Sequence, residues 1–287
     1  MEITGKTRLT GLIGSPVAHS ISPQMHNEAF RQLGLDYVYL AFDLGHSDLR
    51  KAVEGLREIG IRGFNVTMPY KVPILELMDS LTPAARIAGA CNTVIAQDGK
   101  MTGHTTDGIG FMQSVIDAGY DIIGKKMTIL GAGGAATAII TQAALDGVTD
   151  IDIFRRNRPE AFSTTETFAK TVENSTPCRV HVYDISDTRQ LKESLDSSAI
   201  LVNATNVGMA PNEQDCPIGD ASLLHPELIV GDIIYNPRKT RLYQMAESAG
   251  CPVFNGMYML LFQGAASFEC WTGQKMPVEI IRKKYFS

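Results

Sequence analysis

The chain has 287 residues, of which 44% are hydrophobic and 20% are charged, and its formal net charge is −5. This composition is ordinary for a globular protein and excludes a disordered or collagen-like chain. The excess of acidic residues argues against a dedicated nucleic-acid binder, whose surface would be basic. At about 150 residues per domain the length predicts two domains, although one large barrel would fit the same length.

Cysteine usage and the hydrophobic runs predict the compartment. The five cysteines have no Cys-x-x-Cys spacing and are odd in number, so we expect reduced thiols rather than disulfides or a metal site. The first ten residues lack the apolar stretch of a signal peptide, and no run approaches the roughly 18 apolar residues of a membrane span. We therefore expect a cytoplasmic protein that binds neither membrane nor nucleic acid.

Strands and helices are predicted to alternate in the first part of the chain. Strands are expected at 8–13, 37–42, 61–67, 93–96 and 101–104. Asp98-Gly99 predicts a two-residue hairpin turn between the last two of them. A capping residue followed by proline predicts helix starts at Ser22-Pro23 and at Thr82-Pro83, and Ser47 is expected to cap a helix between those two. Such alternation predicts βαβ units and a largely parallel sheet.

A second series of elements begins near residue 108. A helix is expected at 109–118, and strands are expected at 126–130, 151–154, 199–202 and 228–234. Two polar stretches, 158–165 and 211–217, have the composition of exposed loops.

Residues 127–144 carry the strongest local motif in the chain. A short apolar strand leads directly into Gly131-Ala132-Gly133-Gly134-Ala135-Ala136, and an apolar helix follows. This is G-x-G-x-x-A in the strand–turn–helix context of dinucleotide-binding domains. Gly131 permits the tight turn, Gly133 lets the backbone approach a pyrophosphate, and the first amides of the helix face the anion. The alternative is a glycine-rich turn without a ligand, which this context disfavours.

The end of the next strand bears on the choice of dinucleotide. An NAD site usually places a carboxylate there for the ribose diol. Here the strand ends in Arg155 and Arg156, with Arg158 nearby, and guanidinium groups suit a 2′-phosphate. Asp152 is expected to lie inside the strand, so we do not take it as the carboxylate that binds the ribose. The residues favour NADP, and a solvated basic loop is the alternative.

Polar residues gather where the strands of the first domain are expected to end. They are Ser20, Ser22, Asn65, Thr67, Lys71, Asn92, Thr106 and Asp107. The carboxyl ends of parallel strands form a ligand crevice, and hydroxyl and amide groups there suit a small ligand rich in hydroxyl groups. Singly, each residue has a simpler explanation as a cap, a turn residue or an exposed lysine. Their joint placement favours a binding site.

A series of short motifs, in this order, resembles the shikimate dehydrogenase family. The motifs are Ser20-Ile21-Ser22-Pro23, Asn65-Val66-Thr67-x-Pro69-x-Lys71, Gly89-Ala90-x-Asn92-Thr93, Thr106-Asp107-Gly108, the glycine turn, Asn203-Ala204-Thr205, Tyr235-Asn236-Pro237 and Gln263-Gly264-Ala265. The resemblance covers essentially the whole chain. It is greatest to the branch that acts on shikimate, or on both shikimate and quinate.

The resemblance implies a function and a set of site residues. The implied reaction is the reversible reduction of 3-dehydroshikimate to shikimate by NADPH, on the way to chorismate and the aromatic amino acids. Lys71 and Asp107 are the implied catalytic pair. The implied substrate-binding residues are Ser20, Ser22, Thr67, Lys71, Asn92, Asp107, Tyr235 and Gln263. NADP, or alternatively NAD, would be bound by Gly131, Ala132, Gly133, Gly134, Ala135, Arg155, Arg156, Arg158, Thr205, Ile233, Gly256 and Met259. No metal is implied.

The implied fold is α/β, with two domains. An N-terminal α/β substrate domain, residues 1–107, would be completed by a C-terminal helix, residues 258–287, and residues 108–257 would form a Rossmann-type parallel-sheet domain for NADP. We expect a monomer or a homodimer. The sequence departs from the family pattern in the arginine-rich end of the second dinucleotide strand, in Met68 where valine is usual, and in Tyr258 directly before Met259, where glycine is common.

Two other functions remain open at this stage. One is a quinate/shikimate dehydrogenase that uses NAD as well as NADP. The other is a non-catalytic sensor of the same ligands, against which the presence of both Lys71 and Asp107 argues.

Overall fold

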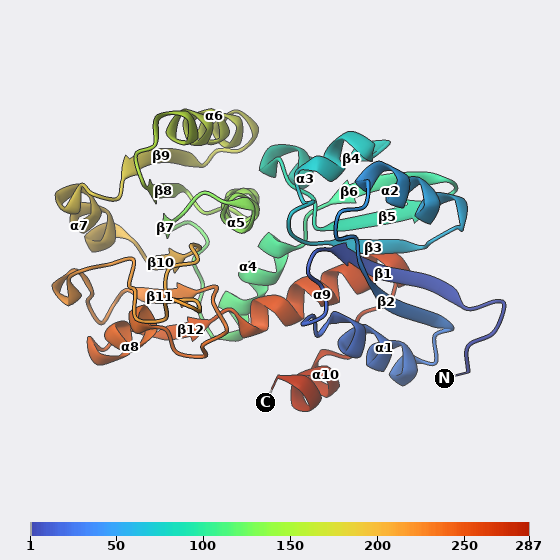
Figure 1. Cartoon of the computed structure of the whole chain (residues 1–287). Coiled ribbons are helices and arrows are strands. Elements are labelled where there is room, and N and C mark those ends of the chain that lie inside the picture. Colours follow the sequence, from blue (N-terminus) through green and yellow to red (C-terminus); the bar gives the residue numbers. More distant parts are fainter. Residues whose placement is uncertain (1, 287) are drawn as a thin grey trace. The chain divides into compact units, whose positions relative to one another are not determined.

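The computed structural model, which describes residues 2–286, consists of two α/β units (Figure 1). Unit 1 comprises the chain up to Gly110 together with the segment from Leu261 onward, and unit 2 comprises Phe111–Leu260. The α/β class predicted from the sequence is confirmed. No helix within the described residues is both long and apolar enough to cross a membrane.

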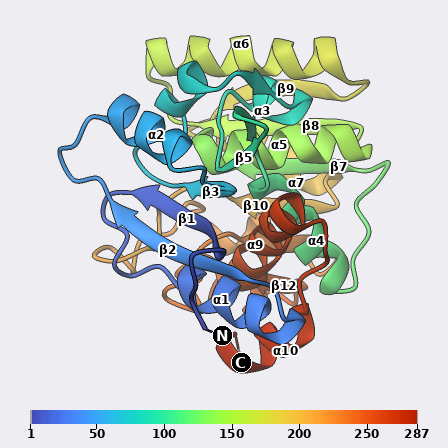
Figure 2. The same ribbon diagram turned by 90° about the vertical axis from the view of Figure 1, so that its right-hand side faces the viewer.

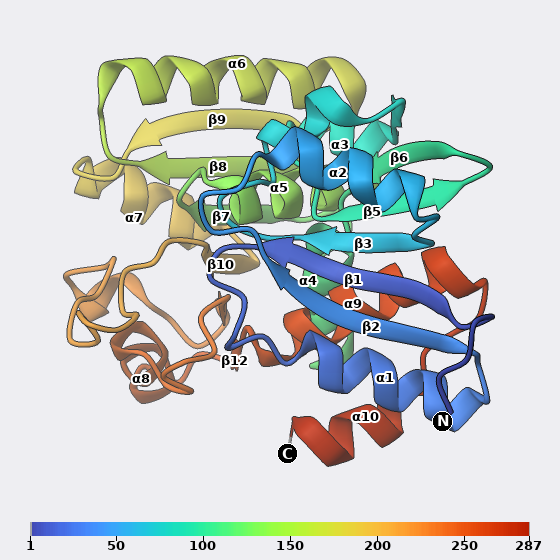
Figure 3. The ribbon, with the colours of Figure 1, turned by 45° about the vertical axis from the view of Figure 1, so that its right-hand side comes forward.

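Unit 1 is built on one mixed sheet with the strand order β2-β1-β3-β5-β6-β4. The strands are β1 (Arg8–Gly14), β2 (Tyr37–Asp43), β3 (Gly63–Val66), β4 (Ser80–Leu81), β5 (Thr93–Gln97) and β6 (Lys100–His104). β1 is parallel to β2 and β3, whereas β5 is antiparallel to both β3 and β6. Figure 3 shows these neighbours side by side. The sheet is therefore only partly parallel, because a hairpin replaces a further βαβ crossover.

The β5–β6 hairpin has the predicted two-residue turn. Asp98 and Gly99 have φ angles of 52° and 75°. Positive φ at both central residues is the type I′ geometry, which matches the twist of the flanking strands and favours an Asp-Gly pair.

The helices of unit 1 cover both faces of its sheet. They are α1 (Ser22–Leu33), α2 (Leu49–Glu58), the 3₁₀ helix η1 (Pro73–Leu77), α3 (Pro83–Ala88) and α10 (Val278–Tyr285), joined by the first residues of α4 (Asp107–Asp117) and most of α9 (Met257–Thr272). α2 and η1 pack on one face through Val53, Leu56 and Ile74. α10 lies beside α1 (Figure 2), and Lys284 Nζ is 2.9 Å from Glu28 Oε2.

Two of the three predicted helix caps are wrong in detail. α1 is preceded by Ile21 rather than capped by Ser22, and the Ser22 N–H donates instead to Ser20 Oγ at 3.2 Å. α2 is capped by Asp48, whose Oδ1 accepts the Arg50 N–H at 2.9 Å, because a carboxylate competes better than the neighbouring serine for this position. Thr82 caps α3 as predicted.

The face of the sheet that carries α1 and α9 has an aromatic core. Phe30, Tyr39, Phe268 and Trp271 are fully buried there. Trp271 Nε1 donates to Val94 O at 3.0 Å, which holds the indole against β5. A Cβ on Gly63 would come within 2.3 Å of the indole, so glycine is required at this position.

Unit 2 contains a parallel sheet with the order β12-β11-β10-β7-β8-β9. The strands are β7 (Lys126–Leu130), β8 (Asp150–Arg155), β9 (Arg179–Asp184), β10 (Ile200–Asn203), β11 (Ile229–Asp232) and β12 (Val253–Asn255). The helices are α5 (Gly134–Asp146), α6 (Pro159–Ser175), α7 (Thr188–Ser197), the 3₁₀ helix η2 (Ala221–Leu223) and α8 (Arg241–Ser248). This strand order is that of a Rossmann-type domain, as expected.

One predicted loop of unit 2 is wrong and the other is right. Residues 158–165 form the start of α6, whose hydroxyl groups bond back to the helix itself, as Thr164 Oγ1 does to Glu160 O at 2.8 Å. The polar composition that suggested a loop is therefore satisfied within the helix. Residues 211–217 form an exposed irregular segment. All five cysteines are free thiols, as expected.

Candidate active site

Lys71 and Asp107 form an ion pair at the carboxyl edge of the unit 1 sheet. Lys71 lies in the loop between β3 and η1, and Asp107 is the first residue of α4, just after β6. Lys71 Nζ is 2.6 Å from Asp107 Oδ2, and the two side chains are 24% and 11% exposed. Most of the surface of the pair is thus shielded from bulk solvent, and a small part of each side chain remains exposed. This arrangement suits a group that holds and moves a proton.

Asn92 fixes the other oxygen of the Asp107 carboxylate. Asn92 Nδ2 donates to Asp107 Oδ1 at 2.8 Å and also lies 3.2 Å from Gln263 Oε1. Asn92 Oδ1 accepts the Thr106 N–H at 2.7 Å, which sets the orientation of the amide. Lys71, Asn92, Asp107 and Gln263, four of the predicted site residues, are therefore brought together by the fold.

A buried chain of neutral polar groups continues behind this cluster. Ser267 Oγ lies 2.8 Å from Thr93 Oγ1 and 3.1 Å from Thr106 Oγ1, and it accepts from Asn65 Nδ2 at 3.0 Å. Asn65 Oδ1 in turn accepts from the Tyr39 hydroxyl at 2.8 Å. Because every group in this chain is neutral, it can lock the site without placing a competing charge near the ion pair.

Of the residues predicted to hold the substrate, Ser20 lies in the loop after β1, Ser22 is the first residue of α1, and Thr67 lies in the loop after β3. Ser20 Oγ accepts the Ser22 N–H. The Ser22 side chain is itself hydrogen-bonded to Tyr39: burial raises the pKa of Tyr39, and this hydrogen bond acts to lower it. The two loops meet closely, since a Cβ on Gly14 would come within 2.2 Å of Thr67 Cγ2. Within the described residues none of these three side chains bonds directly to Lys71 or Asp107. Tyr235 belongs to unit 2, where it is 44% exposed.

The glycine turn of unit 2 forms an open cradle between β7 and α5. Gly131 has a φ of 103°, and a Cβ there would lie 2.9 Å from Ala204 O. A Cβ on Gly133 or Gly134 would have no atom of the described chain within 4 Å. No side chain in the described part of the molecule caps the start of α5, so its first amides remain available to an anion. The turn, including Ala132 and Ala135, therefore fits a pyrophosphate.

The three arginines after β8 do not share one environment. One guanidinium nitrogen of Arg155 donates to Ala161 O at 2.6 Å and also to Thr165 Oγ1, so this side chain is engaged by α6. Burial, together with the neighbouring charges of Arg158 and Arg156, lowers the pKa of Arg155. Arg156 and Arg158 are exposed. These two are therefore better placed than Arg155 to meet a 2′-phosphate.

Asp152 lies inside β8 as predicted. It is 1% exposed, and its Oδ2 is 2.7 Å from Lys126 Nζ and accepts from Ser194 Oγ at 2.6 Å. This carboxylate is part of the unit 2 interior and is not presented to a ribose.

The loops after β10 and β11 are fastened by a second buried network. Asn203 Nδ2 donates to Asp232 Oδ1 at 3.1 Å, and Thr240 Oγ1 donates to Asp232 Oδ2 at 2.6 Å. Burial raises the pKa of Asp232. Thr205 Oγ1 donates to Asn203 Oδ1 at 2.7 Å. This predicted cofactor residue is thus held in place by its own loop.

The remaining predicted cofactor residues lie near β11 and at the start of α9. A Cβ on Gly256 would come within 1.8 Å of Ile233 O, so the two backbones can cross only because residue 256 is glycine. Met259 is 8% exposed in the first turn of α9. Within residues 2–286 no group of three or more His, Cys, Asp or Glu side chains is arranged to hold a metal ion.

Comparisons with known proteins assign the chain to a family. The family model described as the shikimate dehydrogenase substrate binding domain matches residues 12–94, and the shikimate 5′-dehydrogenase C-terminal domain matches residues 256–284. The shikimate dehydrogenase (NADP(+)) of Listeria monocytogenes serotype 4b (strain F2365) is 51% identical over 285 residues, which cover 99% of this chain and 98% of that relative. The chain belongs to the shikimate dehydrogenase family.

Solved structures of the shikimate dehydrogenase family agree with this assignment. Shikimate 5-dehydrogenase from Listeria monocytogenes, in complex with shikimate and NAD, matches with a TM-score of 0.95 and 51% identity over 99% of this chain and 98% of that chain. Quinate dehydrogenase from Corynebacterium glutamicum, in complex with NAD, matches with a TM-score of 0.87 and 27% identity over 98% of this chain and 99% of that chain. As a member of the shikimate dehydrogenase family, the chain is an oxidoreductase that acts on a CH–OH group.

Sequence reasoning missed two members of the unit 1 network, Ser267 and Tyr39. A signal for Ser267 was present, because it follows Gln263 by four residues and therefore shares its helix face. Tyr39 gave no comparable signal, since aromatic residues in a strand are ordinary core residues.

Proposed function

We propose that this member of the family catalyses the reversible NADPH-dependent reduction of 3-dehydroshikimate to shikimate in the cytoplasm, on the route to chorismate and the aromatic amino acids. The observation that carries the proposal is the Lys71–Asp107 ion pair at 2.6 Å, with Asn92 and Gln263 bonded beside it. The curated relative named shikimate dehydrogenase (NADP(+)) supports the same reaction.

The pair has a direct role in this chemistry. Bound NADPH would supply the hydride that reaches the carbonyl carbon. Lys71 Nζ can present an N–H to the carbonyl oxygen, which stabilises the developing alkoxide and delivers the proton that completes the hydroxyl group. Asp107 keeps that ammonium group in place, and in the reverse direction it can accept a hydrogen bond from the substrate hydroxyl.

The surrounding groups would select a polyhydroxylated substrate. The amides of Asn92 and Gln263 can each exchange hydrogen bonds with ring hydroxyls, and a substrate that lacks a hydroxyl would leave a buried amide unpaired. Ser20, Ser22 and Thr67 would bind the carboxylate through hydroxyl groups. Tyr235 is proposed as a further contact. Since one chain supplies Lys71, Asp107 and Gln263, a monomer or a homodimer would both be competent.

We propose NADP as the preferred cofactor, with NAD as the alternative. The open glycine turn and the uncapped start of α5 suit the pyrophosphate that both cofactors share. The exposed guanidinium groups of Arg156 and Arg158 suit the 2′-phosphate that only NADP carries. The absence of a free carboxylate at the end of β8, among the described residues, favours the same choice.

A kinetic matrix tests the proposal. Shikimate and quinate are each oxidised with NADP⁺ and with NAD⁺ by the purified chain, and Lys71→Met serves as the inactive control. We expect the highest kcat/KM for shikimate with NADP⁺. A preference for quinate with NAD⁺ would instead assign the chain to the activity of the quinate dehydrogenase that it resembles. Binding of shikimate without hydride transfer at any pH would identify a sensor.

A further inference from the structure

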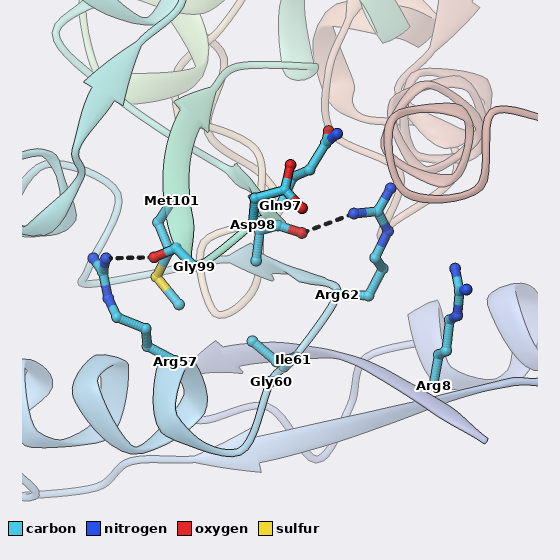
Figure 4. A pocket seen from close by; sticks show the side chains of 10 residues that line it. Arg8, Arg57, Gly60, Ile61, Arg62, Gln97, Asp98, Gly99 and Met101 are labelled. Carbon is cyan, nitrogen blue, oxygen red and sulfur yellow. Dashed lines mark hydrogen bonds between the residues drawn. The ribbon is translucent and has the colours of Figure 1, made fainter. Parts of the chain in front are cut away.

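Figure 4 shows the residues that line a cavity of about 360 Å³ in unit 1. The cavity lies at the opposite end of the sheet from the Lys71–Asp107 pair. Its walls come from the start of β1, the segment between α2 and β3, and the turn of the β5–β6 hairpin. The side chains of Arg8, Arg57 and Arg62 line it. Lys71 and Asp107 follow the carboxyl ends of β3 and β6, so the two places are separated by the length of the strands.

Two of the three arginines are fixed by neutral groups. Arg62 Nε donates to Trp271 O at 3.1 Å, and another of its nitrogens donates to Ala96 O at 2.9 Å. Arg8 donates to the Tyr37 hydroxyl at 3.2 Å and lies 5.7 Å from the centre of that ring. Such partners orient a guanidinium without neutralising it. Neither arginine has an ion-pair partner within residues 2–286.

The acidic groups around the cavity do not balance its positive charge. Arg57 is paired with Asp79 at 2.8 Å and also donates to Gly99 O at 3.0 Å. Asp98 is the one carboxylate among the residues that line the cavity. Three guanidinium groups thus face two nearby carboxylates, in a protein whose overall charge is −5. A local excess of positive charge in an acidic protein favours an anionic ligand.

The geometry of the donors defines the chemical class of that ligand. A guanidinium has five N–H donors in a planar fork, which matches the two oxygens of a carboxylate or phosphate. Arg62 uses its Nε and one terminal nitrogen on backbone carbonyls, so its other terminal nitrogen is left for a ligand. The volume lies within the usual range of small-molecule sites. We propose that this cavity is a second ligand site, which binds a small molecule through a carboxylate or phosphate group.

Calorimetric titration of the whole chain with citrate and with inorganic phosphate tests this assignment. We expect at least one of the two anions to bind with a dissociation constant of about 1 mM or below. The anion that binds more tightly shows whether the natural ligand is a carboxylate or a phosphate. Arg8→Gln and Arg62→Gln should each weaken binding by at least about tenfold, the effect expected for loss of one charge-assisted hydrogen bond.

Arg50→Gln is the matched control, because Arg50 is an exposed arginine of α2 that does not line the cavity. It should leave the affinity unchanged. Should Arg62→Gln fail to fold because Trp271 O loses its donor, Arg8→Gln decides alone. The assignment is overturned if neither anion binds at millimolar concentration, or if the affinity survives Arg8→Gln unchanged. A phosphate ion bound only at the glycine turn of unit 2 would leave the affinity unchanged in Arg8→Gln.

Discussion

His26 should make the stability of unit 1 depend on pH in a way that can be calculated. Its ring is fully buried on α1, stacked on Tyr39 with centroids 4.4 Å apart and 5.2 Å from the centroid of Trp271. Neither ring nitrogen has a hydrogen-bond partner in the described structure. Burial lowers the pKa of His26 from its ordinary value near 6.5 to about 3.

The sign of the effect follows from which state binds the proton. Below a pH of about 6.5 the unfolded chain protonates His26, whereas the folded chain keeps it neutral down to about 3. The contribution of His26 to the free energy of unfolding is therefore fully present above about pH 6.5. It is lost at about 1.4 kcal/mol for each pH unit as the pH falls from there toward about 3. Between pH 7.5 and pH 4.5 the loss that comes from this one group amounts to about 2.7 kcal/mol.

Urea unfolding of His26→Phe and of the native sequence at these two pH values measures the difference. Trp271 is the one tryptophan of the chain and lies against His26, so its fluorescence reports unfolding at this place. The free energy of unfolding should fall by about 2.7 kcal/mol more in the native chain than in the variant. His46→Gln, at an exposed position, should behave like the native chain. An equal fall in the native chain and in His26→Phe would refute the reasoning, whatever the absolute stability of the variant.

Three further predictions concern the proposed catalytic and cofactor sites. Lys71→Ala should lower kcat by about 10²–10⁴-fold with a smaller change in the KM for shikimate. Lys51→Ala, at an exposed position on α2, should leave kcat unchanged. An equal loss of kcat in both variants would contradict the proposed role of Lys71. Arg156→Ala should raise the KM for NADP⁺ by about tenfold and that for NAD⁺ much less, and equal effects on both would refute the contact with the 2′-phosphate. Gly133→Ala should weaken cofactor binding but change the free energy of unfolding by no more than about 1 kcal/mol, because the added methyl group enters open space in the chain without cofactor. Gly256→Ala should lower the free energy of unfolding by about 2 kcal/mol or more, because its methyl group meets Ile233 O. Thermal unfolding of the two variants measures the difference.

Features that depend on neighbouring residues in the sequence were predictable. The Asp98-Gly99 turn is determined by the two residues that adopt positive φ. The glycine turn before α5 is likewise set by local sequence, as is the end of β3, after which Lys71 follows. Each of these was located because its conformation is decided within a few residues.

Features that depend on distant partners were not predictable. β9 was missed although polar and apolar residues alternate over Arg179–Val182, the pattern of a half-buried strand; its place at the edge of the sheet follows only from its pairing with β8. The side chain of Arg155 was expected to face the cofactor, but it donates to Ala161 O, which belongs to the first turn of α6, and residues 158–165 at the start of that helix were expected to form a loop. Propensity is a weak guide where tertiary contacts decide the outcome.

Helix α9 shows why unit 1 needs a segment so far along the chain. Gln263, Ser267 and Trp271 are spaced four residues apart on α9 and therefore share one face of the helix. Gln263 meets Asn92 beside the ion pair, Ser267 closes the neutral network, and Trp271 fastens the helix to β5 through Val94 O. One helix face thus connects the aromatic core to the amide that lies beside the Lys71–Asp107 pair. Because that position depends on packing along about two turns of helix, a change in the aromatic core such as at Trp271 should displace Gln263 and alter the KM for shikimate more than kcat.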